Sequence, residues 1–139
     1  MQRLKTWAAA VAIVALTGAA RAALVSNLNG TVTDTNTNLI WLQDWNVNGA
    51  QNWATQKAWA EGLTFAGSAE WGLPDLTEYR ALFNAYGDLR SDTLPFVDVQ
   101  SNSYWSGTDE GTNAWLFGAS GGSGLSPKSG AKYAVAVRD

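Results

Sequence analysis

The sequence predicts one domain of the α+β class, in which two helices pack on short antiparallel strands. Two observations carry this prediction. Short stretches alternate apolar and polar residues, as half-buried strands do, and two longer segments combine helical periodicity with residues that cap helix N-termini. The chain has 139 residues, which is enough for one modest hydrophobic core and too few for two domains.

The first 22 residues are expected to be a signal peptide, and residues 23–139 the mature domain. Arg3 and Lys5 precede an apolar stretch at residues 7–16, and Ala20-Arg21-Ala22 has the small-x-small form of a cleavage site. The apolar stretch is shorter than the roughly 20 residues that span a bilayer, so no transmembrane anchor is expected. An uncleaved anchoring helix is the alternative. The expected location is secreted, periplasmic or on the cell surface.

A hairpin is expected at the start of the mature domain. Residues 30–34 alternate Thr and Val before Asp34, and residues 39–45 form a second apolar stretch. The cluster between them, Asp34-Thr-Asn-Thr-Asn38, is rich in turn-forming residues, and Asn tolerates positive φ.

Two helices follow the hairpin. Asn48 with Gln51 resembles a capping box, which predicts a helix over about residues 50–61. Asp75 with Glu78 has the same form and predicts a second helix. Its apolar residues fall at helical spacing and are expected to face the core: Leu76, Tyr79, Leu82, Phe83 and Tyr86.

The last third of the chain is expected to be mostly β. Residues 90–100 form a connector with weak strand character, and strands are predicted at residues 103–106, 114–117 and 133–138. Residues 118–130 contain five Gly and four Ser. That composition predicts a long flexible hairpin connection, which either contacts a partner or is only a solvated linker.

Five motifs in this order resemble the Lcl C-terminal domain family, named after the end domain of a bacterial collagen-like adhesin. They cover about residues 29–139 and read Gly30-x-Val32-x-Asp34-x-x-Thr37-Asn38-Leu39-x-Trp41, Trp71-x-Leu73-Pro74-x-x-x-Glu78, Tyr104-Trp105-Ser106-Gly107-Thr108, Ala114-Trp115 and Tyr133-Ala-Val-Ala-Val-Arg138. The resemblance implies a compact α+β domain similar to the C-type-lectin-like and formylglycine-enzyme-like group, found in exported bacterial proteins. This chain has Gly72 where members commonly carry Arg, Asn38 where they commonly carry Gly, and none of the cysteines of some members.

Composition argues against several functions. The chain contains neither Cys nor His, so it lacks thiol chemistry and the commonest general base and metal ligand. No basic run exists, so nucleic acid is not an expected partner. Of 9 basic residues, Arg3, Lys5 and Arg21 leave with the expected signal peptide, which gives 6 basic against 12 acidic residues and a net charge of −6. The adhesin after which the family is named is associated with sulfated polysaccharides, which need a basic surface, so that ligand is not carried over to this chain.

Metal and catalytic sites have weaker support. Asp34-x-Asn36-x-Asn38 begins like a calcium loop, but Leu39 and Trp45 stand where an EF-hand needs Gly and Glu, so a hairpin turn is favoured. Two interpretations of residues 109–113 stay open, a calcium site and a solvated turn. No cofactor is expected. A cryptic hydrolase would draw on the carboxylates of Asp44, Asp75, Glu78 and Asp98, although no spacing singles out a pair.

Of the eight tryptophans, the seven that follow the expected signal peptide are predicted to divide into two groups. Those in the motifs are predicted to be core residues: Trp41, Trp71, Trp105 and Trp115. The pattern fixes Trp45, Trp53 and Trp59 less firmly, and one or two of these are candidates for stacking on a sugar.

The leading hypothesis is a secreted, non-catalytic binding or adhesion module whose partner is an extracellular glycan or protein. The loops at residues 106–114 and 118–130 are expected to form its recognition face, because Asn, Ser, Gly and Thr suit adaptable hydrogen bonding. The candidate ligand-binding residues are Asp109, Asn113, Ser120, Ser123, Ser126 and Lys128. The alternatives are a structural component of an extracellular matrix or envelope, and a carboxylate-dependent hydrolase.

Expression with an export system should yield a chain that begins at Ala23, because Ala20-Arg21-Ala22 has the form that signal peptidase cleaves. N-terminal sequencing of the secreted fraction measures this directly. An intact Met1 in that fraction would contradict the assignment.

Overall fold

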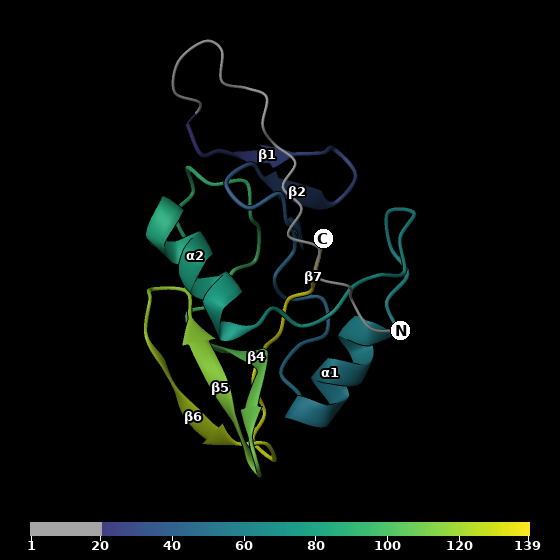
Figure 1. Cartoon of the computed structure of the whole chain (residues 1–139), viewed down its shortest axis with the longest axis vertical. Helices are drawn as coiled ribbons and strands as arrows, with labels where there is room; N and C mark the ends of the chain where they lie inside the picture. Colours follow the sequence, from purple (N-terminus) through teal and green to yellow (C-terminus); the bar gives the residue numbers. More distant parts are fainter. Residues whose placement is uncertain (1–20) are drawn as a thin grey trace.

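The computed structural model describes residues 21–139 and shows two helices and seven strands in two antiparallel sheets. The α+β class predicted from the sequence is confirmed. The first sheet has the order β1-β2-β3-β7 and the second β4-β5-β6. Figure 1 shows β1 and β2 at one end of the molecule and β4–β6 at the other. The signal-peptide prediction falls almost entirely outside the described residues. Neither described helix has the length and apolar character that crossing a membrane requires.

The first sheet is built around the predicted hairpin. β2 (Thr31–Asp34) pairs with β3 (Ile40–Leu42), and β1 (Leu24–Ser26), which the sequence analysis missed, adds to the other edge of β2. The Asp34 carboxylate accepts the backbone N–H of Asn36 at 2.8 Å, and Asn38 has φ 63°. Tyr86 also donates its hydroxyl to Asp34 at 2.6 Å. The 34–38 segment is thus a hairpin turn, as favoured over a calcium loop.

The two helices differ in how well the sequence predicted them. α2 (Leu76–Tyr86) has the predicted capping box, in which Glu78 N–H donates to Asp75 at 2.8 Å and Asp75 N–H donates to Glu78 at 3.0 Å. α1 (Trp53–Glu61) begins later than expected, because Asn52 is its N-cap. The predicted cap at Asn48 and Gln51 was wrong. Gln51 exchanges two backbone hydrogen bonds with Lys132, so it is extended there.

The second sheet corrects the largest sequence-based error. β4 (Ser103–Glu110) and β5 (Asn113–Gly118) pair in antiparallel register, with an irregularity between Trp105 and Asp109. β6 (Ser123–Pro127) then pairs with β5 along its whole length. Residues 118–130 are therefore not one flexible connection. The sequence did not predict β6 because its Gly and Ser residues do not alternate with apolar ones. β6 is an edge strand whose residues are mostly exposed to solvent.

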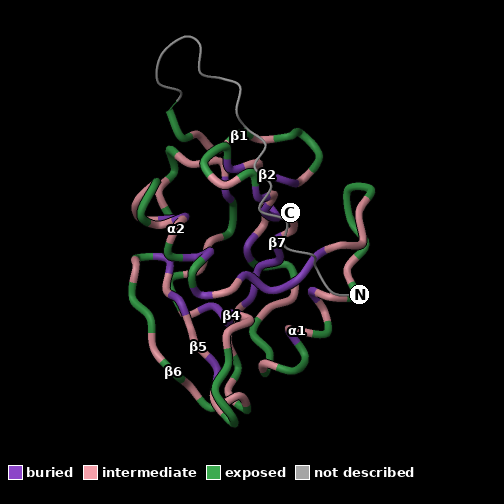
Figure 2. Tube along the Cα trace, viewed as in Figure 1, coloured by how far each residue is buried: buried purple, intermediate pink, exposed green. Residues whose placement is uncertain are grey.

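The C-terminal segment runs between the two sheets. Residues 134–137 are all buried, and Figure 2 shows buried chain gathered along the middle of the molecule. The predicted strand at 133–138 is reduced to β7 (Val137–Arg138). Burial on both sides replaces the expected alternation, because this segment bonds in turn to residues of both sheets. The backbone of Tyr133 hydrogen-bonds to Ser103 and Trp105, the two neighbours of Tyr104 in the second sheet. In the first sheet, Ala136 O accepts the N–H of Leu42.

An aromatic cluster fills the core. Trp41 and Trp45 stack with ring centroids 5.8 Å apart, and Trp45 contacts Tyr104 at 5.2 Å. Trp41, Trp71 and Trp105 are fully buried, as predicted, and so is Trp45, whose position the pattern had left open. Trp115 also packs against the core, but it is less buried than predicted, and its indole N–H donates to Glu110 at 2.9 Å.

Trp105→Phe should destabilise the domain more than Trp45→Phe, by about 1 kcal/mol. Both indoles are completely buried and lose the same volume. Only Trp105 also loses a hydrogen bond, from its Nε1 to Gln51 O at 2.9 Å, whereas Trp45 Nε1 has no partner among residues 21–139. Urea unfolding of the two variants measures the difference. Equal losses of stability would show that the Trp105 hydrogen bond contributes nothing.

Candidate functional site

A polar pocket of about 240 Å³ lies where three chain segments meet. The segments are the stretch after α2, the start of β4, and the turn between β5 and β6. Ser103 and Gly118 are paired across β4 and β5, so the end of the second sheet forms part of the pocket lining. The lining residues are Arg90, Ser101, Asn102, Ser103, Gly118, Ala119 and Ser120.

Buried neighbours position Arg90 at this pocket. Gly87 ends α2, and the next apolar residue, Leu89, is completely buried, with its N–H bonded to Ala119 O at 3.0 Å. Because Leu89 points into the core, Asp88 and Arg90 on either side of it are held at the surface. The chain after α2 is thereby fixed against the turn that carries Ser120.

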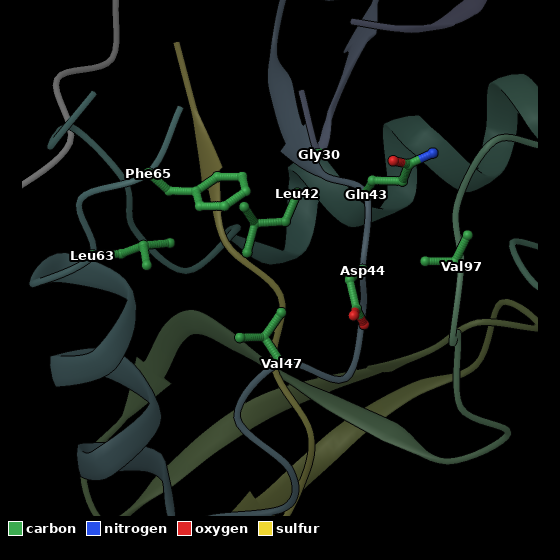
Figure 3. Close-up of a pocket in the computed structure, with 8 residues that line it drawn as sticks. All are labelled: Gly30, Leu42, Gln43, Asp44, Val47, Leu63, Phe65 and Val97. Atoms are coloured by element: carbon green, nitrogen blue, oxygen red, sulfur yellow. The ribbon is translucent and has the colours of Figure 1, made fainter. Parts of the chain in front are cut away.

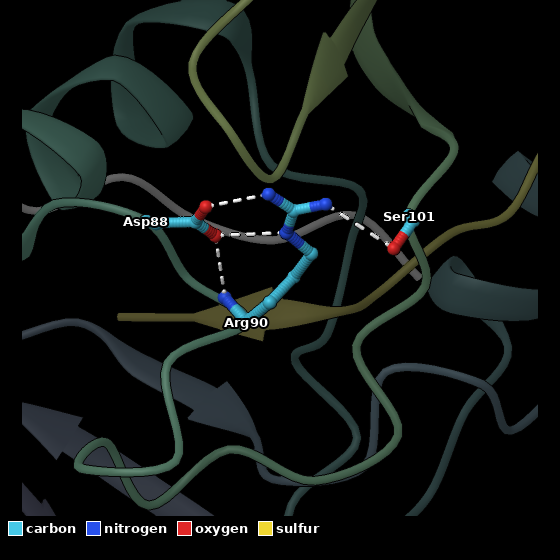
Figure 4. Close-up of polar contacts among 3 residues, drawn as sticks. All are labelled: Asp88, Arg90 and Ser101. Carbon is cyan, nitrogen blue, oxygen red and sulfur yellow. Dashed lines mark hydrogen bonds and ion pairs between the residues drawn. The ribbon is translucent and has the colours of Figure 1, made fainter.

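The Arg90 guanidinium is held in one orientation by two partners, as Figure 4 shows. Its Nε and Nη2 donate to the two carboxylate oxygens of Asp88 at 3.0 and 2.6 Å. Its Nη1 donates to the Ser101 hydroxyl at 3.2 Å. A two-point Arg–carboxylate contact of this kind fixes the plane of the guanidinium, which a single contact would leave free to rotate.

The ion pair also sets the electrostatics of the pocket. Hydrogen bonding from Arg90 lowers the pKa of the Asp88 carboxyl to about 2, and the same bond raises the pKa of Arg90. Both groups are therefore charged at neutral pH and offset one another. Since the pair is exposed to solvent, it adds little to stability, and its main effect is to orient donors without adding net charge.

Several polar groups at the pocket have no protein partner among the described residues. A guanidinium has five N–H groups, and three of those of Arg90 make the bonds above, which leaves two. The side chains of Asn102, Ser103 and Ser120 make no hydrogen bond to residues 21–139. The pocket thus offers donors from Arg90 and both donors and acceptors from an amide and two hydroxyls, which is the set that matches a ligand with several hydroxyl groups.

A family model described as the Lcl C-terminal domain matches residues 30–138, nearly the whole of the described chain. The chain belongs to this family. The resemblance drawn from the five motifs is confirmed. None of the curated proteins matches the chain.

In this Lcl C-terminal domain, the six candidate ligand-binding residues do not form one cluster. The β4–β5 turn and the β5–β6 turn lie at opposite ends of β5, because the three strands are consecutive and antiparallel. Ser120 lines the polar pocket, and Ser123 accepts a hydrogen bond from Arg80 at 3.1 Å. The other four lie toward the opposite end: Asp109, Asn113, Ser126 and Lys128.

At that opposite end, the Lys128 ammonium group already has partners within the protein. It lies 2.7 Å from Asp109 and 4.1 Å from the centre of the Trp53 ring. Hydrogen bonding from Lys128 lowers the pKa of Asp109. Trp53 donates its indole N–H to Ser106 O at 2.9 Å. Lys128 therefore covers one face of the Trp53 ring that a sugar would otherwise stack on.

Two pairs stand out among the carboxylates considered for hydrolysis. Asp75 and Glu78 bond each other's backbone in the capping box of α2, and Asp44 is bridged to Val97, the neighbour of Asp98. Within residues 21–139, no three Asp or Glu side chains come close enough together to hold a metal ion.

Of the residues that line the polar pocket, the sequence analysis named only Ser120 as a candidate and did not name Arg90, Ser101, Asn102 or Ser103. These residues lie in and beside a connector without periodicity. The one local signal was Asp88-Leu89-Arg90, in which an apolar residue separates two opposite charges and predicts that both charges face the same side.

Replacing Arg90 with Gln should raise the pKa of Asp88 from about 2 toward its ordinary value of 3.8, because the hydrogen bond that favours the carboxylate is lost. Because folding lowers the pKa of Asp88, the ion pair stabilises the folded state at pH values above the pKa that Asp88 has in the unfolded chain. This contribution is lost as the pH falls through about 2. A carbon-detected NMR titration of the Asp88 carboxyl measures both proteins. The same midpoint in both would show that Arg90 does not hold Asp88 in solution.

Proposed function

We propose that this domain is a non-catalytic extracellular binding module that recognises an uncharged glycan at the pocket beside Arg90. The observation that carries the proposal is that several hydrogen-bonding groups without a partner among residues 21–139 line one pocket. Arg90, Asn102, Ser103 and Ser120 come from three segments that the fold brings together. Small-molecule sites typically combine a pre-formed concave shape with a few well-placed polar groups.

The size of the pocket favours a single sugar unit. A volume of about 240 Å³ lies below the roughly 300–1,000 Å³ of pockets that enclose drug-sized ligands. The open side of the pocket then leaves the rest of a glycan chain in solvent. Recognition of one terminal or internal unit is the binding mode that these dimensions support.

Charge favours a neutral ligand. Asp88 offsets the charge of Arg90 inside the site, and the chain as a whole has 9 basic and 12 acidic residues. A sulfated or carboxylated glycan would meet an Arg already paired with a carboxylate, on a protein of negative net charge. A neutral sugar requires only the orientation of the guanidinium, which the Asp88 pair supplies.

A glycan array that carries matched neutral and sulfated glycans tests the proposal. Binding should favour neutral glycans and change little between low and physiological salt, because no ligand charge is screened. Arg90→Gln should weaken binding about tenfold or more, the usual effect of losing a hydrogen bond to a charged donor.

Arg80→Gln is the matched control. It removes the same charge from an exposed Arg outside the pocket, and it should leave glycan binding unchanged. Equal losses for both variants, or a preference for sulfated glycans that salt abolishes, would contradict the proposed site. Concentration-dependent assembly of the domain without any glycan binding would support a structural role instead.

A further inference from the structure

A second pocket, of about 220 Å³, has almost entirely apolar walls. Figure 3 shows Leu63 and Phe65 on one side of it and Val97 on the other, with Leu42, Val47 and Asp44 between them. Gly30 and Gln43 complete the lining. None of these residues lines the polar pocket, so the two sites are separate.

A tight turn positions the Phe65 side chain as one wall. Phe65 and Ser68 exchange two backbone hydrogen bonds around Ala66 and Gly67, and Trp71 Nε1 donates to Phe65 O at 3.3 Å. The Phe65 ring lies directly against Gly30, where a Cβ would stand 2.7 Å from its Cζ atom and where φ is +87°. Only glycine meets both conditions without strain, so the first residue of the family motif helps to form this wall.

The rim of this pocket is unusually apolar for a solvent-exposed surface. Six large apolar side chains of the described chain are exposed, and three of them, Val47, Phe65 and Val97, belong to this one pocket. They are 53%, 38% and 45% exposed. Scattered exposed apolar residues need no explanation, but a cluster around a concave site indicates a binding surface.

Asp44 is the only charged residue that lines the pocket. One of its carboxylate oxygens accepts the N–H of Asn46 at 2.8 Å, which fixes the side chain. Its other oxygen has no partner among residues 21–139. The pocket therefore combines apolar walls with one oriented, uncompensated negative charge.

We infer that this pocket is the docking site for a partner protein that inserts one apolar side chain with a Lys or Arg next to it. The inference does not depend on glycan binding, because it concerns a different site. The charge follows from Asp44, since an apolar group beside a cation satisfies both the walls and the carboxylate, whereas an anion would be repelled.

The size and the rim point to a protein and not to a free small molecule. A volume of about 220 Å³ accommodates a single side-chain-sized group. If a small ligand filled the pocket, the side chains of Val47, Phe65 and Val97 around its opening would stay exposed to solvent. A protein surface covers the filled pocket and its rim together, which is the arrangement of an anchor residue within a binding interface.

Three blocked tetrapeptides serve as probes: acetyl-Gly-Phe-Lys-Gly-amide, acetyl-Gly-Phe-Glu-Gly-amide and acetyl-Gly-Ser-Lys-Gly-amide. Titration into the isotope-labelled protein, followed by amide NMR, locates the site and measures the affinity of each peptide. The Phe-Lys peptide should shift the amides of Val47, Phe65 and Val97 and bind more tightly than the Phe-Glu peptide. The Ser-Lys peptide should not shift them.

Two variants with matched controls separate the charge from the walls. Asp44→Asn keeps the oxygen that accepts from Asn46, and it should remove the preference for Phe-Lys over Phe-Glu, a difference of up to about fivefold for a solvent-exposed ion pair. Asp92→Asn removes the same charge outside the pocket and should keep the preference. Val47→Ser should weaken the Phe-Lys peptide, whereas Val25→Ser, at a similarly exposed Val on β1, should not.

Three results would overturn the inference. One is the absence of peptide-induced shifts at the pocket amides while thermal melts show a folded protein. Another is equal affinity for Phe-Lys and Phe-Glu peptides in the unaltered protein. The third is tight binding of phenethylammonium at a pocket that binds none of the three peptides, which would assign the site to a free amine.

Discussion

The segment at residues 133–137 holds the two sheets together, and the rest of the fold depends on it. Its backbone bonds to the second sheet at Ser103 and Trp105 and to the first sheet at Leu42, and Val137 exchanges two bonds with Gly72. Ala134 and Ala136 are completely or nearly completely buried, and their small side chains let neighbouring strands approach from both sides. A larger residue at either position would require those strands to separate.

Tyrosine hydroxyls reinforce this connection from inside the core. Tyr104 donates to Trp45 O at 2.8 Å, and Tyr79 of α2 donates to Trp105 O at 3.0 Å. Burial raises the pKa of both tyrosines, so these hydroxyls stay protonated and remain donors at any physiological pH. The bonds join backbone carbonyls of elements that are distant in sequence. They fix where the sheets and α2 stand relative to one another, and hence where the pockets form.

The two pockets have opposite chemistry because they form at different places in the fold. The polar pocket lies at the ends of β4 and β5, where turns rich in Ser and Gly leave hydroxyl and amide groups exposed. The apolar pocket lies beside the first sheet, where the chain after β3 and the Phe65 turn converge. The two proposals together describe a domain that would link a glycan at one pocket to a partner protein at the other.

The amino-acid sequence alone determined the α+β class, the first hairpin, the capping box of α2 and the family. These features rest on local patterns: Asp34 with its Asx turn, Asp75 with Glu78, and apolar residues at helical spacing. Only the tertiary structure decided the start of α1, the strand β6 and both pockets. Gln51 is extended because Lys132 pairs with it, and Ser123–Pro127 forms a strand because β5 offers a free edge. Arg90 and Ser120 line the same pocket because Leu89 bonds to Ala119. In each case the deciding partner is distant in the chain, and hydrogen bonds between distant segments leave no periodic trace in either segment's sequence.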